Sequence, residues 1–192
     1  MIYGFVKHVF RFLSIILFTV KVTGYDNIPS EGRVVLCSNH FNFWDPVLIA
    51  AFMKRKVHFM AKAELFQYPI LKWILTRLGA FPVKRGVGDR KALKSAIDLL
   101  ENDKVFGIFP EGTRSKTGEI QKGEPGLSYI ALKGKSPIIP IGIVGNYKLF
   151  SNIQINIGQP MNLEHYYEKK VSSDELQEIS DRVIEQIISL RK

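Results

Sequence analysis

Residues Val105 to Ser115 read Val-Phe-Gly-Ile-Phe-Pro-Glu-Gly-Thr-Arg-Ser, a short apolar run that changes abruptly into a turn of small and charged residues. The apolar run 105–109 predicts a strand that is covered on both faces, because no polar residue alternates with the apolar ones. Pro110 and Gly112 suit a tight turn directly after it. In α/β sheets, functional residues gather in the loops at the carboxyl ends of strands. The stretch therefore predicts an α/β fold, with a candidate site after residue 109.

The rest of the chain alternates short apolar runs with segments of helical periodicity. Strands are expected at Val20–Gly24, Val34–Ser38, Val57–Ala61, Ala80–Val83, Val105–Phe109, Ile138–Ile143 and Ile153–Ile157. Helices are expected at Pro46–Met53, Tyr68–Leu78, Asp89–Glu101, Gly126–Lys133 and Asp174–Arg191. Pro137 and Pro140 favour an edge or bulged strand at 138–143. Together these patterns predict a single α/β domain with a mostly parallel or mixed sheet of about seven strands, flanked by helices.

Length and charge narrow the class of partner. The chain has 192 residues, which suits one domain with a substantial core, and its formal net charge of +9 favours an anionic partner. An anionic membrane surface, an acidic carrier protein and a phosphorylated substrate fit that charge. Nucleic acid is not expected, because no nucleic-acid-binding motif accompanies the charge. The single cysteine, Cys37, excludes an intrachain disulfide, and no Cys/His spacing is typical of a metal site.

The first 20 residues are mostly apolar, but Lys7, His8 and Arg11 interrupt them. The charge-free remainder is shorter than the roughly 20 residues that a transmembrane helix needs. On a helix, the polar and small residues fall within one arc: Gly4, Lys7, His8, Arg11 and Ser14. This pattern predicts an amphipathic helix over 1–20 in the membrane interface, followed by the α/β domain over 21–192. The alternative is a helix packed on the protein's own core. A signal peptide is not expected, because no small-residue cleavage site follows.

The loop after the second expected strand reads Ser-Asn-His-Phe-Asn-Phe-Trp-Asp-Pro over residues 38–46. His40 is a candidate general base, because imidazole titrates near neutral pH, and Asp45 is a candidate for orienting it. On one straight helix the two side chains would lie about 140° apart, so the segment must turn between them. Pro46 supports such a turn. It also leaves a second interpretation open, in which Asp45 simply caps the helix that begins at Pro46.

Two further loops carry charge after expected strands. Lys84 and Arg85 follow the strand 80–83, and Arg85 offers a fork of donors that suits phosphate. The alternative is a solvated basic turn. Arg114 is a second candidate for binding phosphate. Glu111 could pair with Arg114 in a structural turn, position its loop, or accept a hydrogen bond from a substrate hydroxyl.

These blocks, in this order, resemble those of the glycerolipid acyltransferase family, in particular the lysophosphatidic acid acyltransferases. The family's Asn-His-x-x-x-x-Asp block and its Phe-Pro-Glu-Gly-Thr-Arg-Ser block are both complete, and the matching segments are Asn39 to Asp45, Phe81 to Arg85, Phe109 to Ser115 and Ile138 to Pro140. One departure follows the third block. Relatives usually have a Lys-x-Gly with small or apolar residues after it, whereas Glu124 and Pro125 stand here. This departure puts the identity of the acceptor in question.

The resemblance implies a reaction and a set of site residues. A fatty acyl group would pass from a thioester, acyl-CoA or acyl-carrier protein, to the free hydroxyl of 1-acylglycerol-3-phosphate, a lysophospholipid, and the product would be phosphatidic acid. His40 would deprotonate that hydroxyl and Asp45 would orient His40, with no metal or further cofactor. The substrate-binding residues implied are Lys84, Arg85, Glu111, Gly112, Thr113 and Arg114. The acyltransferase domain 21–192 would work at the cytoplasmic face of the cell membrane as a peripheral or monotopic protein.

Other functions remain open. Within the family the acceptor could be glycerol-3-phosphate, another lysophospholipid or an aminolipid. A hydrolase with Cys37 or Ser38 as nucleophile is disfavoured, because no Gly-x-Ser-x-Gly elbow is present and Cys37 ends an apolar strand. A non-catalytic basic membrane-binding module would need neither His40 nor Asp45.

Overall fold

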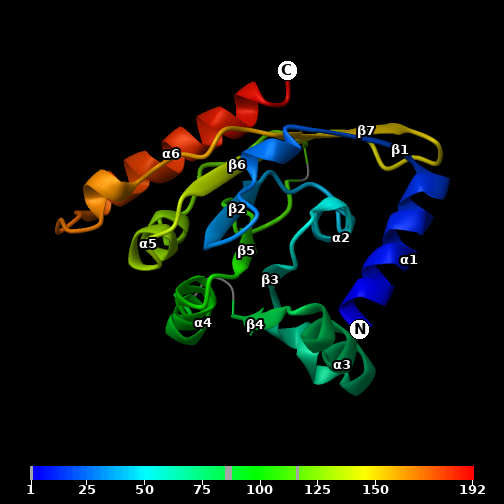
Figure 1. The fold of residues 1–192 in the computed structure, drawn as a ribbon, viewed down its shortest axis with the longest axis horizontal. Helices are drawn as coiled ribbons and strands as arrows, with labels where there is room; N and C mark the ends of the chain where they lie inside the picture. Colours follow the sequence, from blue (N-terminus) through cyan, green and yellow to red (C-terminus); the bar gives the residue numbers. More distant parts are fainter. Residues whose placement is uncertain (1, 85–87, 116) are drawn as a thin grey trace.

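The computed structural model describes residues 2–84, 88–115 and 117–192. Its described strands form one sheet of seven in the order β1-β7-β6-β2-β5-β3-β4 (Figure 1). Strands β6 and β7 run antiparallel, whereas the other neighbouring pairs run parallel. The strands are β1 (Thr19–Thr23), β2 (Val34–Ser38), β3 (Val57–Lys62), β4 (Phe81–Val83), β5 (Val105–Ile108), β6 (Ile138–Gly145) and β7 (Asn152–Ile157). The predicted mixed, mostly parallel sheet is confirmed.

Helices cover both faces of this sheet. They are α1 (Ile2–Leu17), α2 (Asp45–Phe52), α3 (Pro69–Leu78), α4 (Arg90–Glu101), α5 (Gly126–Lys133) and α6 (Ser173–Ser189). Strand β2 is buried along its whole length: Val34 and Leu36 pack with α2, whereas Val35 and Cys37 face α4, α5 and α6. A strand that is covered on both faces has no polar alternation, which is why the run was recognisable in the sequence.

The prolines at 137 and 140 do not mark an edge. Strand β6 lies inside the sheet between β2 and β7, so of the two expectations, an edge strand or a bulged one, the edge strand was wrong. Pro140 is tolerated because β6 pairs with β7 only from Ile141 onward. Before that point the Pro140 carbonyl accepts from the amide of Gly158, and Ile138 forms an isolated bridge with Met161. The missing N–H of Pro140 therefore falls where the neighbouring chain leaves the regular ladder.

Helix α1 is amphipathic, as predicted, and Lys7 and Ser14 of its polar side face the protein, whereas His8 and Arg11 are exposed. It packs against α2, α3 and β1, and Ser14 is fully buried. The Lys7 ammonium donates to the carbonyls of Met53 and Lys54, at the end of α2. The Arg11 guanidinium lies 5.3 Å from the ring centroid of Phe52. The apolar side is left outside, where the exposed residues include Phe5, Phe12, Ile15 and Ile16. Within the described residues, no helix is both long and apolar enough to cross a membrane.

Candidate active site

The loops after β2 and β5 meet at the carboxyl edge of the sheet, because the two strands run parallel and side by side. Two hydrogen bonds join these loops directly. The amide of His40 donates to Glu111 Oε1 at 2.8 Å, and the amide of Ser115 donates to the His40 carbonyl at 2.8 Å. The topology therefore brings together two blocks that are about 65 residues apart in sequence, as the rule for parallel sheets predicts.

His40 and Asp45 form a hydrogen-bonded pair. The distance from His40 Nδ1 to Asp45 Oδ2 is 2.8 Å. The amides of Phe41 and Asn42 donate to the same oxygen at 2.8 Å and 2.7 Å, which folds the segment into the turn that the pairing needs. Asp45 is fully buried and His40 is 7 % exposed. The carboxylate accepts in this geometry, so Nδ1 carries the ring proton and Nε2 is left to accept one.

Asp45 does not cap α2, so that interpretation was wrong. Helix α2 begins at Asp45 itself, with Trp44 in the N-cap position and no side-chain cap. The carboxylate is turned back toward the amides that precede the helix, because those amides belong to the turn that carries His40. Pro46 lies in the first turn of α2, where a proline's missing N–H leaves no helical hydrogen bond unmade.

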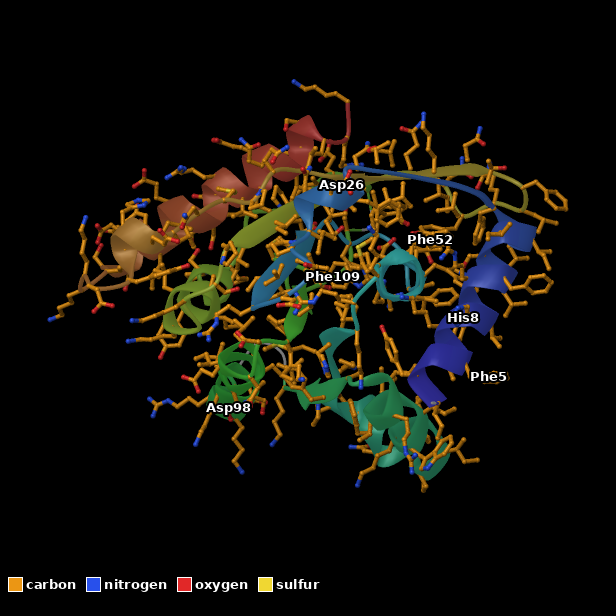
Figure 2. The ribbon with its side chains drawn as sticks, viewed as in Figure 1. Phe5, His8, Asp26, Phe52, Asp98 and Phe109 are labelled. Carbon is orange, nitrogen blue, oxygen red and sulfur yellow. The ribbon has the colours of Figure 1, made fainter. Side chains whose placement is uncertain are left out.

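The His40 ring lies against a cavity of about 640 Å³. It stacks on Phe109, with the ring centroids 4.1 Å apart and the planes inclined by 20°. Figure 2 shows Phe109 near the middle of the molecule, beside β5. The apolar side chains that line the cavity include Met60, Val83, Leu93, Ile108, Leu127 and Ile130. The cavity therefore offers a hydrocarbon environment beside a candidate base.

Only some of the residues predicted to bind the substrate line the cavity. Lys84, Gly112 and Thr113 line the cavity, so the structure brings them together with His40. Arg114 is exposed and lies outside the cavity lining. Arg85 lies outside the described residues.

Glu111 is buried, and both of its carboxylate oxygens accept backbone amides. Oε1 accepts from His40 and Oε2 accepts from Gln121 at 3.1 Å. Among the ion pairs of the described residues, none joins Glu111 to Arg114. Of the three interpretations of Glu111, the geometry supports the one in which it positions its loop.

Two site residues were missed as candidates. Asn39 makes reciprocal hydrogen bonds with the backbone of Ile143 in β6, at 3.0 Å and 2.8 Å. Tyr147 donates its hydroxyl hydrogen bond to Asp45 Oδ1. Tyr147 follows the carboxyl end of β6, so the rule that pointed to the loops after β2, β4 and β5 would have found it if applied to every strand.

Cys37 is fully buried in the cluster between the sheet and helices α4 to α6. Burial, reinforced by the nearby Glu111 carboxylate, raises the pKa of the Cys37 thiol well above its usual range. The thiolate is the nucleophilic form, so this cysteine is inert. Ser38 is also buried, and its hydroxyl donates to the Asn39 carbonyl at 3.2 Å. Neither side chain is arranged as a nucleophile activated by His40.

Comparison with known proteins agrees with this site. A model of the Acyltransferase family matches residues 19–144. The 1-acyl-sn-glycerol-3-phosphate acyltransferase of Bacillus subtilis is 32 % identical over 149 residues, which cover 74 % of this chain and 74 % of the relative. The chloroplast enzyme LPAT1 of Arabidopsis thaliana, which carries the same enzyme name, is 28 % identical over 159 residues, or 76 % of this chain, but this match spans only 44 % of its length.

A solved structure supports the same assignment. The crystal structure of the 1-acyl-sn-glycerophosphate (LPA) acyltransferase PlsC from Thermotoga maritima superposes with a TM-score of 0.72 at 27 % identity, covering 98 % of this chain and 78 % of that one. The family match includes the His40–Asp45 pair and every described residue of the cavity. The resemblance carried by the sequence blocks is thereby confirmed, and the chain belongs to the Acyltransferase family.

Proposed function

We propose that this protein transfers a fatty acyl group from an acyl thioester to the free hydroxyl of 1-acylglycerol-3-phosphate, making phosphatidic acid. The observation that carries the proposal is the hydrogen-bonded His40–Asp45 pair at the wall of a cavity with apolar lining. The printed names of the relatives from Bacillus subtilis and Thermotoga maritima support the choice of acceptor.

The geometry supports direct transfer without an acyl-enzyme. Nε2 of His40 accepts the proton of the acceptor hydroxyl as its oxygen attacks the thioester carbonyl. The tetrahedral intermediate then collapses, the carbon–sulfur bond breaks, and the leaving thiolate takes the proton back from the imidazolium. Asp45 holds Nδ1–H and stabilises the imidazolium between these two steps. A cavity that holds donor and acceptor together makes the reaction effectively unimolecular.

We infer that cations near the cavity bind the acceptor's phosphate. Lys84 lines the cavity, and Arg85 follows it directly in the sequence. Arg114 lies on the same loop as Gly112 and Thr113, which line the cavity, so its long side chain can reach a ligand bound there. The donor is acyl-CoA or acyl-carrier protein, both of which are anionic and suit the net charge of +9.

We also propose that α1 holds the protein on the cytoplasmic face of the cell membrane as a peripheral or monotopic protein. Phe5 and Phe12 on α1 are 72 % and 65 % exposed, and Ile70 and Trp73 on α3, which contacts α1, are 78 % and 54 % exposed. Figure 2 shows Phe5 on the outer side of α1. Apolar residues at this exposure on adjoining helices suit burial in the interface of an anionic bilayer.

The direct experiment supplies vesicles with labelled lysophosphatidate and either acyl-CoA or acyl-carrier protein. The wild-type protein should form labelled phosphatidic acid, and His40→Ala should lose about 10²–10⁴-fold in kcat, the usual contribution of a general base. Undiminished turnover by His40→Ala would exclude the proposed mechanism. Vesicle binding without turnover on any acceptor would instead favour the membrane-binding module.

One observation favours a second acceptor class. The carboxylate of Glu124 is exposed and lines the same cavity as Lys84. A negative charge there opposes a doubly charged phosphate, so an acceptor with lower negative charge, such as another lysophospholipid, is the alternative. A panel of acceptors offered to wild type and Glu124→Gln separates the two. If the alternative is correct, Glu124→Gln will gain activity on lysophosphatidate relative to the other lysophospholipids.

A further inference from the structure

The carboxylate of Asp45 accepts hydrogen bonds at both of its oxygens. Oδ2 accepts from His40 Nδ1 and from the two amides of the turn. Oδ1 accepts from the hydroxyl of Tyr147, which lies just beyond β6 and 102 positions further along the chain. Without Tyr147, the donors would all lie on one side of the carboxylate, and Oδ1 would be left buried with no partner among the described residues.

Tyr147 is a donor in this contact and not an acceptor. Burial, together with the adjacent Asp45 carboxylate, raises the pKa of the Tyr147 hydroxyl. The phenol therefore keeps its proton at neutral pH, and Tyr147 donates the hydrogen bond to Asp45. A hydrogen bond donated to a carboxylate is charge-assisted and therefore strong, so it holds the Asp45 side chain firmly.

Aromatic contacts hold the Tyr147 ring in place. Phe18, the first residue after α1, meets it edge-on at 5.5 Å between centroids, and Phe41 lies at 5.3 Å on a tilted plane. Phe18 is only 5 % exposed. A ring fixed by two neighbours offers its hydroxyl in a single position, so the contact with Oδ1 fixes the rotation of the carboxylate.

We propose that Tyr147 is a positioning residue for the acyl transfer. Its hydroxyl holds Asp45 so that Oδ2 faces His40, and it withdraws part of the carboxylate's charge so that the imidazolium formed in the first step readily returns its proton. The proposal rests on the proposed function for its kinetic consequences, but the hydrogen bond itself and its effect on His40 do not depend on which acceptor is used.

The effect on His40 has a definite sign. Among the described residues, the other titratable groups near the pair are Glu111, whose carboxylate accepts from the His40 amide, and Lys84, Asp89 and Glu124, which line the same cavity as His40. Tyr147→Phe leaves these groups unchanged and removes one donor from the Asp45 carboxylate, so the negative potential at His40 becomes stronger. Protonated imidazole is then favoured, and the acid limb of the pH profile of kcat moves to higher pH.

The experiment compares Tyr147→Phe with Tyr25→Phe. Tyr25 is a matched control, because its hydroxyl donates to the Phe52 carbonyl at 2.9 Å near α2 without touching the dyad. Tyr147→Phe should lower kcat about tenfold or more, since it removes a hydrogen bond to a charged group, while KM stays nearly constant. Tyr25→Phe should change neither kcat nor the pH profile.

A double-mutant cycle between Tyr147 and Asp45 distinguishes a positioning role of Tyr147 from a general effect on the structure. In an Asp45→Ala background, Tyr147→Phe should have almost no further effect on kcat, because Tyr147 acts through Asp45. Full additivity of the two losses would overturn the proposal. 3-Fluorotyrosine at position 147 keeps the ring and strengthens the donor, so it should move the acid limb to lower pH. This second variant serves even where Tyr147→Phe folds poorly.

A measurement that needs no turnover distinguishes the role proposed for Tyr147 from the proposed acyl transfer. NMR titration of the His40 ring should show a midpoint at higher pH in Tyr147→Phe than in wild type, whether or not lysophosphatidate is the acceptor. An unchanged midpoint would overturn the role of Tyr147. Absence of acylation by the wild type, with the midpoint shifted as expected, would overturn the proposed function alone.

Discussion

At the scale of the residue, Asp45 links the shape of its loop to the chemistry of the candidate site. Its buried carboxylate accepts from two amides of the turn, from His40 and from Tyr147. Asp45→Asn replaces one acceptor oxygen by an NH₂ group, which must face either the turn amides or the Tyr147 hydroxyl. We expect a loss of about 1–3 kcal/mol in the free energy of unfolding, together with a large loss of kcat. Denaturant unfolding and kinetics measure the two effects.

The exposed Asp98 in α4 supplies the control for this substitution. Asp98→Asn should leave the free energy of unfolding within about 0.5 kcal/mol of wild type, as for most surface changes. An Asp45→Asn protein as stable as Asp98→Asn would contradict the geometry described for the turn.

Cys37 supports a second prediction at this scale. Because burial raises the pKa of its thiol, native protein should not react with a disulfide reagent, and reaction should follow only after unfolding. Cys37→Ala should keep kcat within about twofold and lose roughly 1 kcal/mol of stability from the small cavity it leaves. A loss of turnover comparable with that of His40→Ala, in folded protein, would restore the thiol mechanism.

The pairing of His40 with Asp45 could be predicted because both residues lie in one short segment, and the proline directly after it indicated a turn there and not a continuous helix. Glu111 was named as a candidate, but its partners are the amides of His40 and Gln121, which no local pattern reveals. The position of Tyr147 just after β6 marks it as a residue of the carboxyl edge, but its contact with Asp45 could not be predicted from spacing. Tyr147 reaches Asp45 only because β6 lies beside β2, and sheet order is a property of the whole chain.

At the scale of the element, the neighbouring strands β3 and β5 place two stacked phenylalanine rings beside His40. Phe59 of β3 stacks on Phe109 at 5.7 Å, and Phe109 stacks on His40. Gly107 makes room for this stack, because a Cβ there would lie 2.3 Å from the Phe59 ring. The absence of a side chain in the middle of a buried strand thus has a steric reason.

Gly107→Ala should therefore displace Phe59 and disturb the support of the His40 ring. We expect about 1–3 kcal/mol of destabilisation from overpacking, accompanied by a fall in kcat. Gly4→Ala is the matched control, since nothing lies within 4 Å of its Cβ position and alanine is the better helix former in α1. Thermal unfolding and kinetics of both variants test the steric argument, which fails if Gly107→Ala behaves like Gly4→Ala.

A strand or helix could be predicted from the sequence when the spacing of its own apolar residues shows which of its faces are buried. Strand β2 and helix α4 show such spacing plainly, since one is buried on both faces and the other repeats its buried residues at Ala92, Ala96 and Leu100. The place of β6 inside the sheet could not be predicted, because Pro140 signals an edge unless the partner chain is known to leave the ladder there. The orientation of α1 could not be predicted either, because helical periodicity defines a polar and an apolar face without saying which of them packs against the protein.

At the scale of the whole molecule, α1 presents its apolar side outward and contacts the similarly exposed α3. Phe12→Glu should weaken binding to anionic vesicles by about tenfold or more, since burying one phenylalanine is worth roughly 1.5–3 kcal/mol. Ile188→Glu in α6 is the matched control, because Ile188 is also an exposed apolar residue, at 45 %, on a different helix. Vesicle sedimentation measures both. Equal weakening by the two variants would mean that charge, and not the α1 surface, governs the binding.

The end of α1 also supports the active site. Phe18 directly follows the helix, and its ring meets both Trp44 and Tyr147 edge-on, at 5.8 Å and 5.5 Å between centroids. Trp44 precedes Asp45 in the chain, whereas Tyr147 donates to its carboxylate. One buried ring thus contacts both the residue before Asp45 and the donor to its carboxylate, so a displacement of Phe18 would reach the catalytic pair through these two rings.

Phe18→Leu tests this connection, because leucine keeps the site apolar but removes the ring edges that hold Tyr147. We expect kcat to fall severalfold while affinity for vesicles stays at the wild-type level, since the outer face of α1 is unchanged. Phe12→Glu should show the opposite pattern, with weaker vesicle binding and an unchanged kcat on a soluble short-chain acceptor. If Phe18→Leu leaves kcat intact, the helix and the catalytic pair act independently. If it lowers kcat alone, the ring of Phe18, directly after α1, holds Tyr147 against Asp45.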